Sequence, residues 1–237
     1  LLTAWAVIRS QRSLQHAAKQ LPCPTDETGS HDKPGSLPLL LCLCFVSVLF
    51  TIAHMQSSTT LLLWARDHTE RRFLRWELPV PYMASLHAGL VIAVSPLASR
   101  LDLKFRTAKG INRIFTKITI GMAVTSLAYV PMVLAAQLSG NMSRVSLGWL
   151  FACLLLLSLA ELLVGALGPS LVLRLAPARH GGRWIGAWYV ATAVGFWVAG
   201  CIGGLWDSVP RSLFFVVLTV LPLLGVAVSL VCRRWLR

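Results

Sequence analysis

The chain has 237 residues, of which 56% are hydrophobic and only 13% are charged. A soluble domain carries about a quarter charged residues, so this chain has too few polar side chains to cover a surface that faces water. Its net charge of +13 does not indicate a nucleic-acid-binding protein, because the basic residues flank long apolar runs instead of lining one face. The composition predicts an integral membrane protein whose basic clusters contact anionic lipid headgroups.

Residues 1–37 differ from the rest of the chain. The first eight residues are typical of the end of a preceding membrane helix, and a polar stretch follows that is interrupted by Pro22, Pro24, Pro34 and Gly35. This pattern predicts a cytoplasmic linker with little regular structure. Because the chain also begins without Met, we expect it to be part of a longer protein.

Residues 38–237 contain six apolar runs, each long enough as a helix to cross a hydrocarbon core of about 30 Å. Backbone groups in lipid must form hydrogen bonds within their own segment, and continuous apolar runs exclude the alternating strands of a barrel. The sequence therefore predicts an all-α bundle of six transmembrane helices, with spans over residues 38–64, 79–99, 118–138, 145–173, 184–206 and 212–232.

The distribution of Lys and Arg predicts the orientation of the bundle. These residues are concentrated in the linker, in loops 100–117 and 174–183, and at the C-terminal end. With six spans, all of these segments fall on one side, which the positive-inside rule assigns to the cytoplasm. We expect both ends of the bundle to be cytoplasmic, in a plasma membrane or a bacterial inner membrane.

Glu161 is the only acidic residue within an expected span. A carboxylate at membrane depth costs about 2.5–3.5 kcal/mol to insert, and such residues face a cavity or a partner. This favours a proton site or a site for a substrate charge, and the alternative is a protonated Glu that only packs between helices. No Lys or Arg lies within an expected span, so we expect the partner of Glu161 to come from outside this segment.

His54 lies in the first span, just before a polar run over residues 56–60. An imidazole can change its charge near physiological pH, so a role in a proton pathway and simple helix–helix hydrogen bonding both stay open. For His87, in the second span, packing is the favoured interpretation. The six cysteines are expected to be free, and neither a metal, nor a cofactor, nor an enzyme signature is expected.

The fourth and fifth spans carry a longer motif. Residues 161–163, Gly168, residues 170–172 and residues 175–179 resemble the pattern E-L-L-x-S-P-x-G-x-S-L-V-x-x-L-A-P-A-R, and residues 76–79 resemble W-E-I-P. Both patterns are typical of the proton-dependent oligopeptide transporter family of the major facilitator superfamily. The match covers about residues 39–237, which correspond to helices seven to twelve, the C-terminal half of such a transporter.

The resemblance implies a secondary active transporter that moves small peptides or similar solutes by alternating access, with the proton as coupling ion. It implies that Glu161 binds the amino terminus of the peptide and pairs with a Lys of a missing N-terminal six-helix half. It further implies that Trp188 lines the peptide pocket. Ser158 lies one turn before Glu161 and is expected to face the same pocket.

Several positions depart from the family pattern. His54 stands where the family has a Glu in F-E-Q-Q-G-S, and it is therefore the candidate for proton coupling together with Glu161. His87 stands at the Asn of S-L-N-P, and Phe196 replaces another family Asn. The alternative to a transporter is a non-transporting membrane scaffold or partner subunit that has lost these functions.

Overall fold

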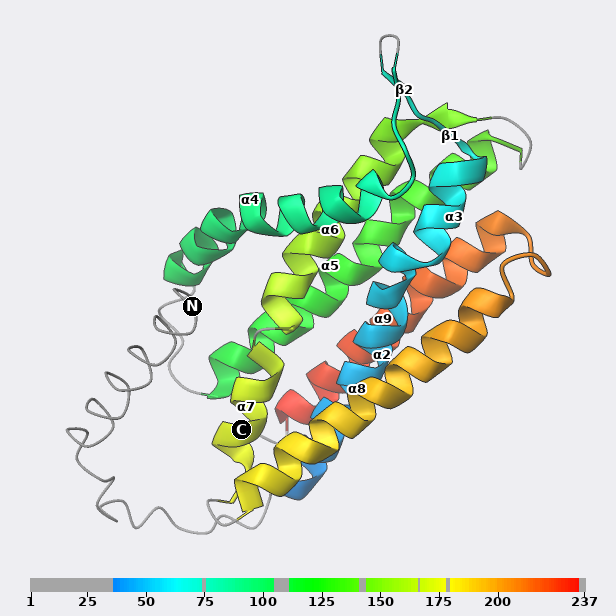
Figure 1. Cartoon of the computed structure of the whole chain (residues 1–237). Helices are drawn as coiled ribbons and strands as arrows, with labels where there is room; N and C mark the ends of the chain where they lie inside the picture. Colours follow the sequence, from blue (N-terminus) through cyan, green and yellow to red (C-terminus); the bar gives the residue numbers. More distant parts are fainter. Residues whose placement is uncertain are drawn as a thin grey trace, which may run out of the picture. The chain divides into compact units, whose positions relative to one another are not determined.

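The computed structural model describes residues 36–73, 76–104, 111–140, 144–165, 167–177 and 180–234. The linker expected over residues 1–37 thus lies outside the described residues up to residue 35. The described part is almost entirely helical (Figure 1). Its elements are α2 (Ser36–Met55), η1 (Gln56–Ser58), α3 (Thr60–Asp67), β1 (Thr69–Glu70), β2 (Arg72–Phe73), β3 (Trp76–Glu77), α4 (Tyr82–Lys104), α5 (Ile111–Leu138), β4 (Val145–Ser146), α6 (Leu147–Val164), α7 (Leu167–Leu175), α8 (Gly181–Gly204) and α9 (Arg211–Arg234).

Five helical segments of the described chain are long and apolar enough to cross a membrane: Leu37–Asp67, Ile114–Leu138, Leu147–Leu175, Gly181–Gly204 and Arg211–Cys232. The run expected over residues 79–99 forms α4, in which only Tyr82–Pro96 is apolar. Figure 1 shows α4 lying across α6, whereas the other long helices run roughly along one direction. The fold is an α-helical membrane bundle in which α4 is the atypical member.

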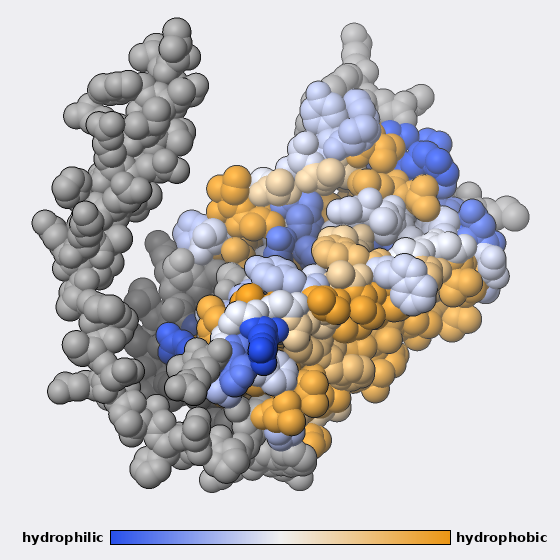
Figure 2. Space-filling view, turned by 60° about the horizontal axis from the view of Figure 1, so that its bottom comes forward, coloured by the Kyte–Doolittle hydropathy of each residue, from blue (hydrophilic) through white to orange (hydrophobic). Residues whose placement is uncertain are grey.

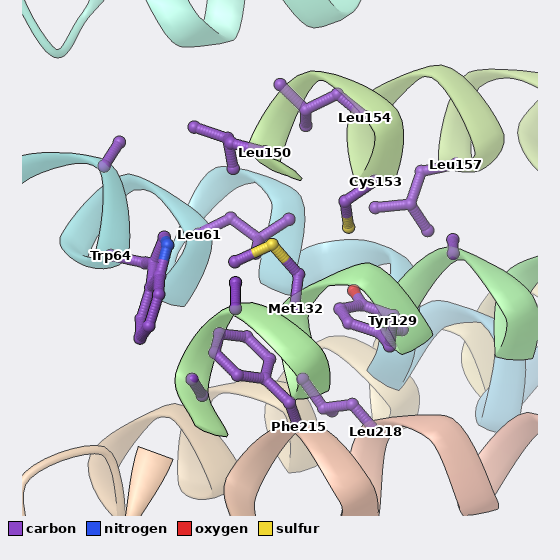
Figure 3. Packing of buried hydrophobic residues seen from close by; sticks show 14 of the residues in the cluster. Leu61, Trp64, Tyr129, Met132, Leu150, Cys153, Leu154, Leu157, Phe215 and Leu218 are labelled. Atoms are coloured by element: carbon purple, nitrogen blue, oxygen red, sulfur yellow. The ribbon is translucent and has the colours of Figure 1, made fainter. Parts of the chain in front are cut away.

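The bundle is held together by two sets of helix contacts. Helix α5 packs against α6 and α9, helix α2 packs against α8 and α9, and α4 packs against α6. One apolar core joins α3, α5, α6 and α9 around Trp64, Tyr129 and Phe215 (Figure 3). A second core joins α2, α5, α7 and α8. Short strands connect the loops at one end, where β1 pairs with β4 and β2 pairs with β3.

The first expected span is interrupted in its polar run. Between α2 and α3, Thr59 has φ −122° and ψ −90°, outside the helical region. The buried amide of Gln56 donates to the carbonyl of Ala199 in α8 at 3.1 Å, and its oxygen accepts hydrogen bonds from Thr59 and Thr60. Because backbone or polar groups freed by a break in lipid need partners, this side-chain network makes the break tolerable.

The fourth expected span is divided into two helices on either side of residue 166, which lies outside the described residues. Helix α6 ends at Val164, with Gly165 as its cap, and α7 begins at Leu167. The backbone N–H of Gly165 donates to the carbonyl of Glu161 at 2.8 Å, so Glu161 belongs to the last turn of α6. His54 likewise belongs to the last turn of α2. The two breaks therefore place both predicted site residues at helix carboxyl ends.

The surface of the bundle agrees with a membrane environment. Figure 2 shows broad hydrophobic areas on the face in view, and hydrophilic residues gather mainly toward one end and in the middle of this face. Helix α8 exposes large apolar side chains along its length, including Tyr189, Val190 and Trp197, of which Trp197 is 72% exposed. Such a face is stable only against lipid or another apolar surface.

Candidate functional site

The carboxylate of Glu161 contacts an imidazole from another helix. Oε2 of Glu161 lies 3.1 Å from Nε2 of His87, which is within hydrogen-bonding distance. Glu161 comes from the last turn of α6 and His87 from the first half of α4. His87 of the same chain therefore supplies one partner of Glu161 that the sequence did not predict, and the pairing of Glu161 with a Lys of a missing N-terminal half stays a prediction.

His54 completes the cluster from a third helix. Its Nε2 lies 3.7 Å from Oε2 of Glu161, slightly beyond a hydrogen bond. The rings of His54 and His87 meet edge to face, with centroids 5.6 Å apart. The structure thus brings His54 and Glu161, both site candidates from the sequence, close together and adds His87. We call His54, His87 and Glu161 the His–His–Glu cluster.

Neighbouring side chains fix the orientation of His54. Phe50, one turn earlier in α2, stacks on the imidazole with centroids 5.2 Å apart and an interplanar angle of 11°. The hydroxyl of Tyr129 in α5 donates to the carbonyl of Ala53, the residue before His54. Tyr129 is completely buried. The imidazole is therefore held by packing before any ligand arrives.

The three side chains differ in exposure. The side chains of His54 and His87 are each 14% exposed, whereas that of Glu161 is 37% exposed. The carboxylate is therefore the most exposed member of the cluster, and the two imidazoles beside it are largely buried.

The environment of the ring nitrogens indicates a tautomer. Nδ1 of His54 and Nδ1 of His87 are both buried without a hydrogen-bond partner in the described structure. A buried N–H without a hydrogen-bond partner costs more free energy than a buried nitrogen lone pair without one. In the neutral form, we therefore assign the proton of His87 to Nε2, from which it donates to Glu161.

The charge of the carboxylate sets an electrostatic preference. Glu161 and His54 lie in the last turns of α6 and α2, and η1 and α7 follow within three residues, so the partial charges of adjoining helix ends largely cancel there. The carboxylate itself therefore favours a cation at the cluster, whether a proton, an ammonium group or a metal ion.

The other two predicted site residues are not members of the His–His–Glu cluster. Trp188 of α8 is 6% exposed and belongs to the second apolar core. Its ring packs against Gly168 of α7 so closely that a Cβ added to Gly168 would lie 2.3 Å from Cζ2. Ser158 is fully buried and donates to the carbonyl of Leu154 at 2.8 Å. Their roles in substrate binding stay predictions.

His87 is the site residue that the sequence did not single out. A lone histidine within a span usually serves packing, and nothing in the local pattern of α4 distinguishes it. The sequence offered one signal for a polar role of His87. It stands at a position where the family has an Asn, and the expected spans contain one acid with which it could pair. Which face of α4 meets α6 could not be read from the sequence, because α4 lies across the bundle.

Comparison with known proteins gives a consistent result. The model of the POT family (PTR2) matches residues 31–219 of the chain. A peptide transporter of Yersinia enterocolitica, YePEPT, is 32% identical over 170 residues, which are 69% of this chain and 33% of the relative. Dipeptide and tripeptide permease A of Erwinia pyrifoliae is 29% identical over 171 residues, 72% of this chain and 34% of the relative. The chain thus spans about a third of the length of these relatives.

Solved structures with the same fold agree. A POT family transporter in complex with 5-aminolevulinic acid superposes with a TM-score of 0.71 at 17% identity, covering 84% of this chain and 40% of that one. The peptide transporter POT in complex with sulfate gives 0.71 at 21% identity, covering 82% and 40%. At these identities the likeness shows the fold. The match of the family model over most of the chain shows that this chain belongs to the POT family.

Proposed function

We propose that the protein to which this chain belongs is a secondary active transporter that moves small peptides or similar solutes across the membrane by alternating access. One observation carries the proposal: a half-open carboxylate, Glu161, lies at a helix break against two imidazoles, His54 and His87. The names of the relatives support it, because YePEPT and the permeases are described as transporters of peptides. They favour a transporter over the scaffold alternative.

Glu161 is proposed to receive the amino group of the substrate. An ammonium group and a carboxylate form a charge-assisted hydrogen bond, which is about twice as strong as a neutral one. The side chain of Glu161 is partly exposed in the described structure. An ammonium group that reaches the carboxylate can therefore bind it.

The two histidines are proposed to carry the coupling proton. An imidazole within hydrogen-bonding distance of a carboxylate can share a proton with it, and its unperturbed pKa lies close to physiological pH. A proton that arrives at His54 or His87 changes the charge next to Glu161. Protonation and substrate binding therefore influence each other electrostatically, which is the requirement for coupling two fluxes.

Alternating access needs a second surface and a place to bend. The relatives are about three times as long as the matched segment, which supports a further six-helix half that closes the cavity over Glu161. The breaks after α2 and α6 supply positions where the backbone can change direction. The distribution of Lys and Arg supports a cytoplasmic location for both ends of the bundle, in a plasma membrane or bacterial inner membrane.

The experiment that tests this function is uptake of a radiolabelled dipeptide by proteoliposomes that contain the full-length protein. An inward proton gradient is expected to drive accumulation above the external concentration. A protonophore is expected to reduce the uptake to equilibration. Uptake equal to that of empty liposomes, with correctly inserted protein, contradicts the proposal.

A further inference from the structure

We propose that the His–His–Glu cluster is also a binding site for a divalent transition-metal ion of the Zn²⁺ class, and that the ion inhibits transport by occupying the carboxylate that receives the substrate. The inhibition rests on the proposed function, whereas the binding of the ion does not. One ligand atom from each of His54, His87 and Glu161 lies within 4.8 Å of the other two.

The distances match a tetrahedral metal site. Zn²⁺ binds His nitrogen and carboxylate oxygen at about 2.0–2.2 Å, so two of its tetrahedral ligands lie about 3.4 Å apart. The two distances from Oε2 of Glu161 are 3.1 Å to His87 and 3.7 Å to His54. They bracket the tetrahedral value. The ligand atoms of His54 and His87 lie within 4.8 Å of each other, so the two imidazoles must approach each other by up to about 1.4 Å to share one ion.

The donor set determines the class of ion. Imidazole nitrogen suits Zn²⁺, Cu²⁺, Ni²⁺ and Fe²⁺, whereas Mg²⁺ and Ca²⁺ prefer oxygen ligands. Two histidines with one carboxylate form a common three-ligand set for zinc, in which a fourth position stays open. Here the open position falls on the exposed side of Glu161, where water or a substrate atom can complete the coordination.

The surroundings set the strength of the site. The carboxylate favours a cation, and Phe50 and the packing around α2 hold His54 in place. An imidazole that binds through Nε2 carries its proton on Nδ1, and both Nδ1 atoms are buried without a partner. Histidine ligands in tight zinc sites donate the N–H to a hydrogen-bond partner, and removal of that partner lowers the affinity for the metal about 10–100-fold. We therefore expect the ion to bind reversibly rather than as a permanent part of the structure.

A bound ion would block the transport cycle in two ways. It would neutralise the charge of Glu161 that otherwise attracts the amino group of the substrate, and it would tie α2, α4 and α6 to one point. Because alternating access requires rearrangement around the breaks beside His54 and Glu161, such a tie would hold the bundle in one state. Zn²⁺ is accordingly expected to act as an inhibitor that a chelator reverses.

The first test measures binding alone. The purified full-length protein competes with a chromophoric chelator for Zn²⁺, and the variants His54→Gln, His87→Asn and Glu161→Gln are compared with His68→Asn. His68 packs on Trp64 outside the cluster, so it controls for loss of a histidine. Each cluster variant is expected to bind Zn²⁺ at least tenfold more weakly, and the control to bind like the unaltered protein. Equal binding by all variants would mean an adventitious surface ion and would overturn the proposal.

If the variants fail to fold, a second measurement on the unaltered protein tests the site. X-ray absorption of the Zn²⁺-loaded unaltered protein is expected to show two imidazole ligands and one carboxylate oxygen, and a shell of another composition would overturn the site. In proteoliposomes, buffered Zn²⁺ is expected to reduce dipeptide uptake at least tenfold, with recovery after chelation. If uptake is absent without Zn²⁺, the transport proposal fails while the site stands. If uptake occurs but Zn²⁺ neither binds nor inhibits, the site fails alone.

Discussion

Nε2 of His87 lies 3.1 Å from Oε2 of Glu161, although the two residues are 74 positions apart and belong to α4 and α6. The contact occurs in the last turn of α6, immediately before the chain turns into α7. This contact therefore belongs both to the packing of α4 on α6 and to the candidate site. A change in the protonation or ligand state of Glu161 acts directly on the attachment of α4.

The energetic coupling of this pair can be measured with a double-mutant cycle. Residues that share a hydrogen bond have interaction energies of about 0.5–3 kcal/mol. We expect Glu161→Gln and His87→Asn to be non-additive in the unfolding temperature of the purified protein, because each removes the same contact. A double variant whose shift equals the sum of the two single shifts would contradict a direct interaction.

Gln56 is expected to be the most sensitive polar residue outside the cluster. Its amide is completely buried and connects α2, the break and the carbonyl of Ala199. In Gln56→Leu these partners lose their hydrogen bonds, and leaving buried polar groups unpaired costs about 1–3 kcal/mol each. A clear drop in the unfolding temperature is expected, measured by differential scanning fluorimetry in detergent.

Thr119→Val is the matched control for Gln56. The Thr119 hydroxyl only donates to the carbonyl of Phe115, within its own helix, so its removal leaves no other helix without a partner. The control is expected to change the unfolding temperature little. If Gln56→Leu were as mild as Thr119→Val, the network at the break would not support the helix interruption.

Two glycines of α8 provide a test of its packing on α2. A Cβ at Gly195 would lie 2.8 Å from Cβ of Thr51 and 3.1 Å from the carbonyl of Val48, whereas a Cβ at Gly200 meets no atom within 4 Å. Gly195→Ala is expected to destabilise the protein by about 1–3 kcal/mol, because α8 must move away from α2. The unfolding temperature of the two alanine variants gives the comparison.

Gly200→Ala is expected to be neutral or slightly stabilising. Alanine is favoured over glycine within a helix by about 1 kcal/mol, and the added methyl group enters open space in the bundle. Equal destabilisation by both substitutions would show that the close approach of α8 and α2 at Gly195 is not the cause. Both variants replace a glycine of α8 by alanine, so the change in helix propensity is the same in both.

The sequence predicted the parts of this structure that depend on local composition. Five of the expected apolar runs coincide with helices long enough to span a membrane, because length and hydropathy alone set this property. The breaks at Gln56 and after Val164 were not predicted. The break at Gln56 depends on a tertiary partner, the carbonyl of Ala199, which cannot be read from a hydropathy pattern.

The candidate site could be predicted in part for a similar reason. Glu161 and His54 were identified because a carboxylate and an imidazole are unusual at membrane depth. His87 was assigned to packing, since its contact with Glu161 depends on how α4 lies across α6. The favoured role of Trp188 came from family resemblance, and the structure shows what the sequence could not, that its ring packs tightly on Gly168.

The most direct test of the account is dipeptide uptake by proteoliposomes that contain the Glu161→Gln variant, with Asp207→Asn as the matched carboxylate-to-amide control. Asp207 pairs with Arg211 outside the cluster and is 89% exposed. Loss of a charged partner of a bound charge costs about 1.5–3 kcal/mol, so uptake by Glu161→Gln is expected to fall at least tenfold, while Asp207→Asn transports normally. Unchanged proton-driven uptake by Glu161→Gln would contradict the central claim that this carboxylate receives the substrate.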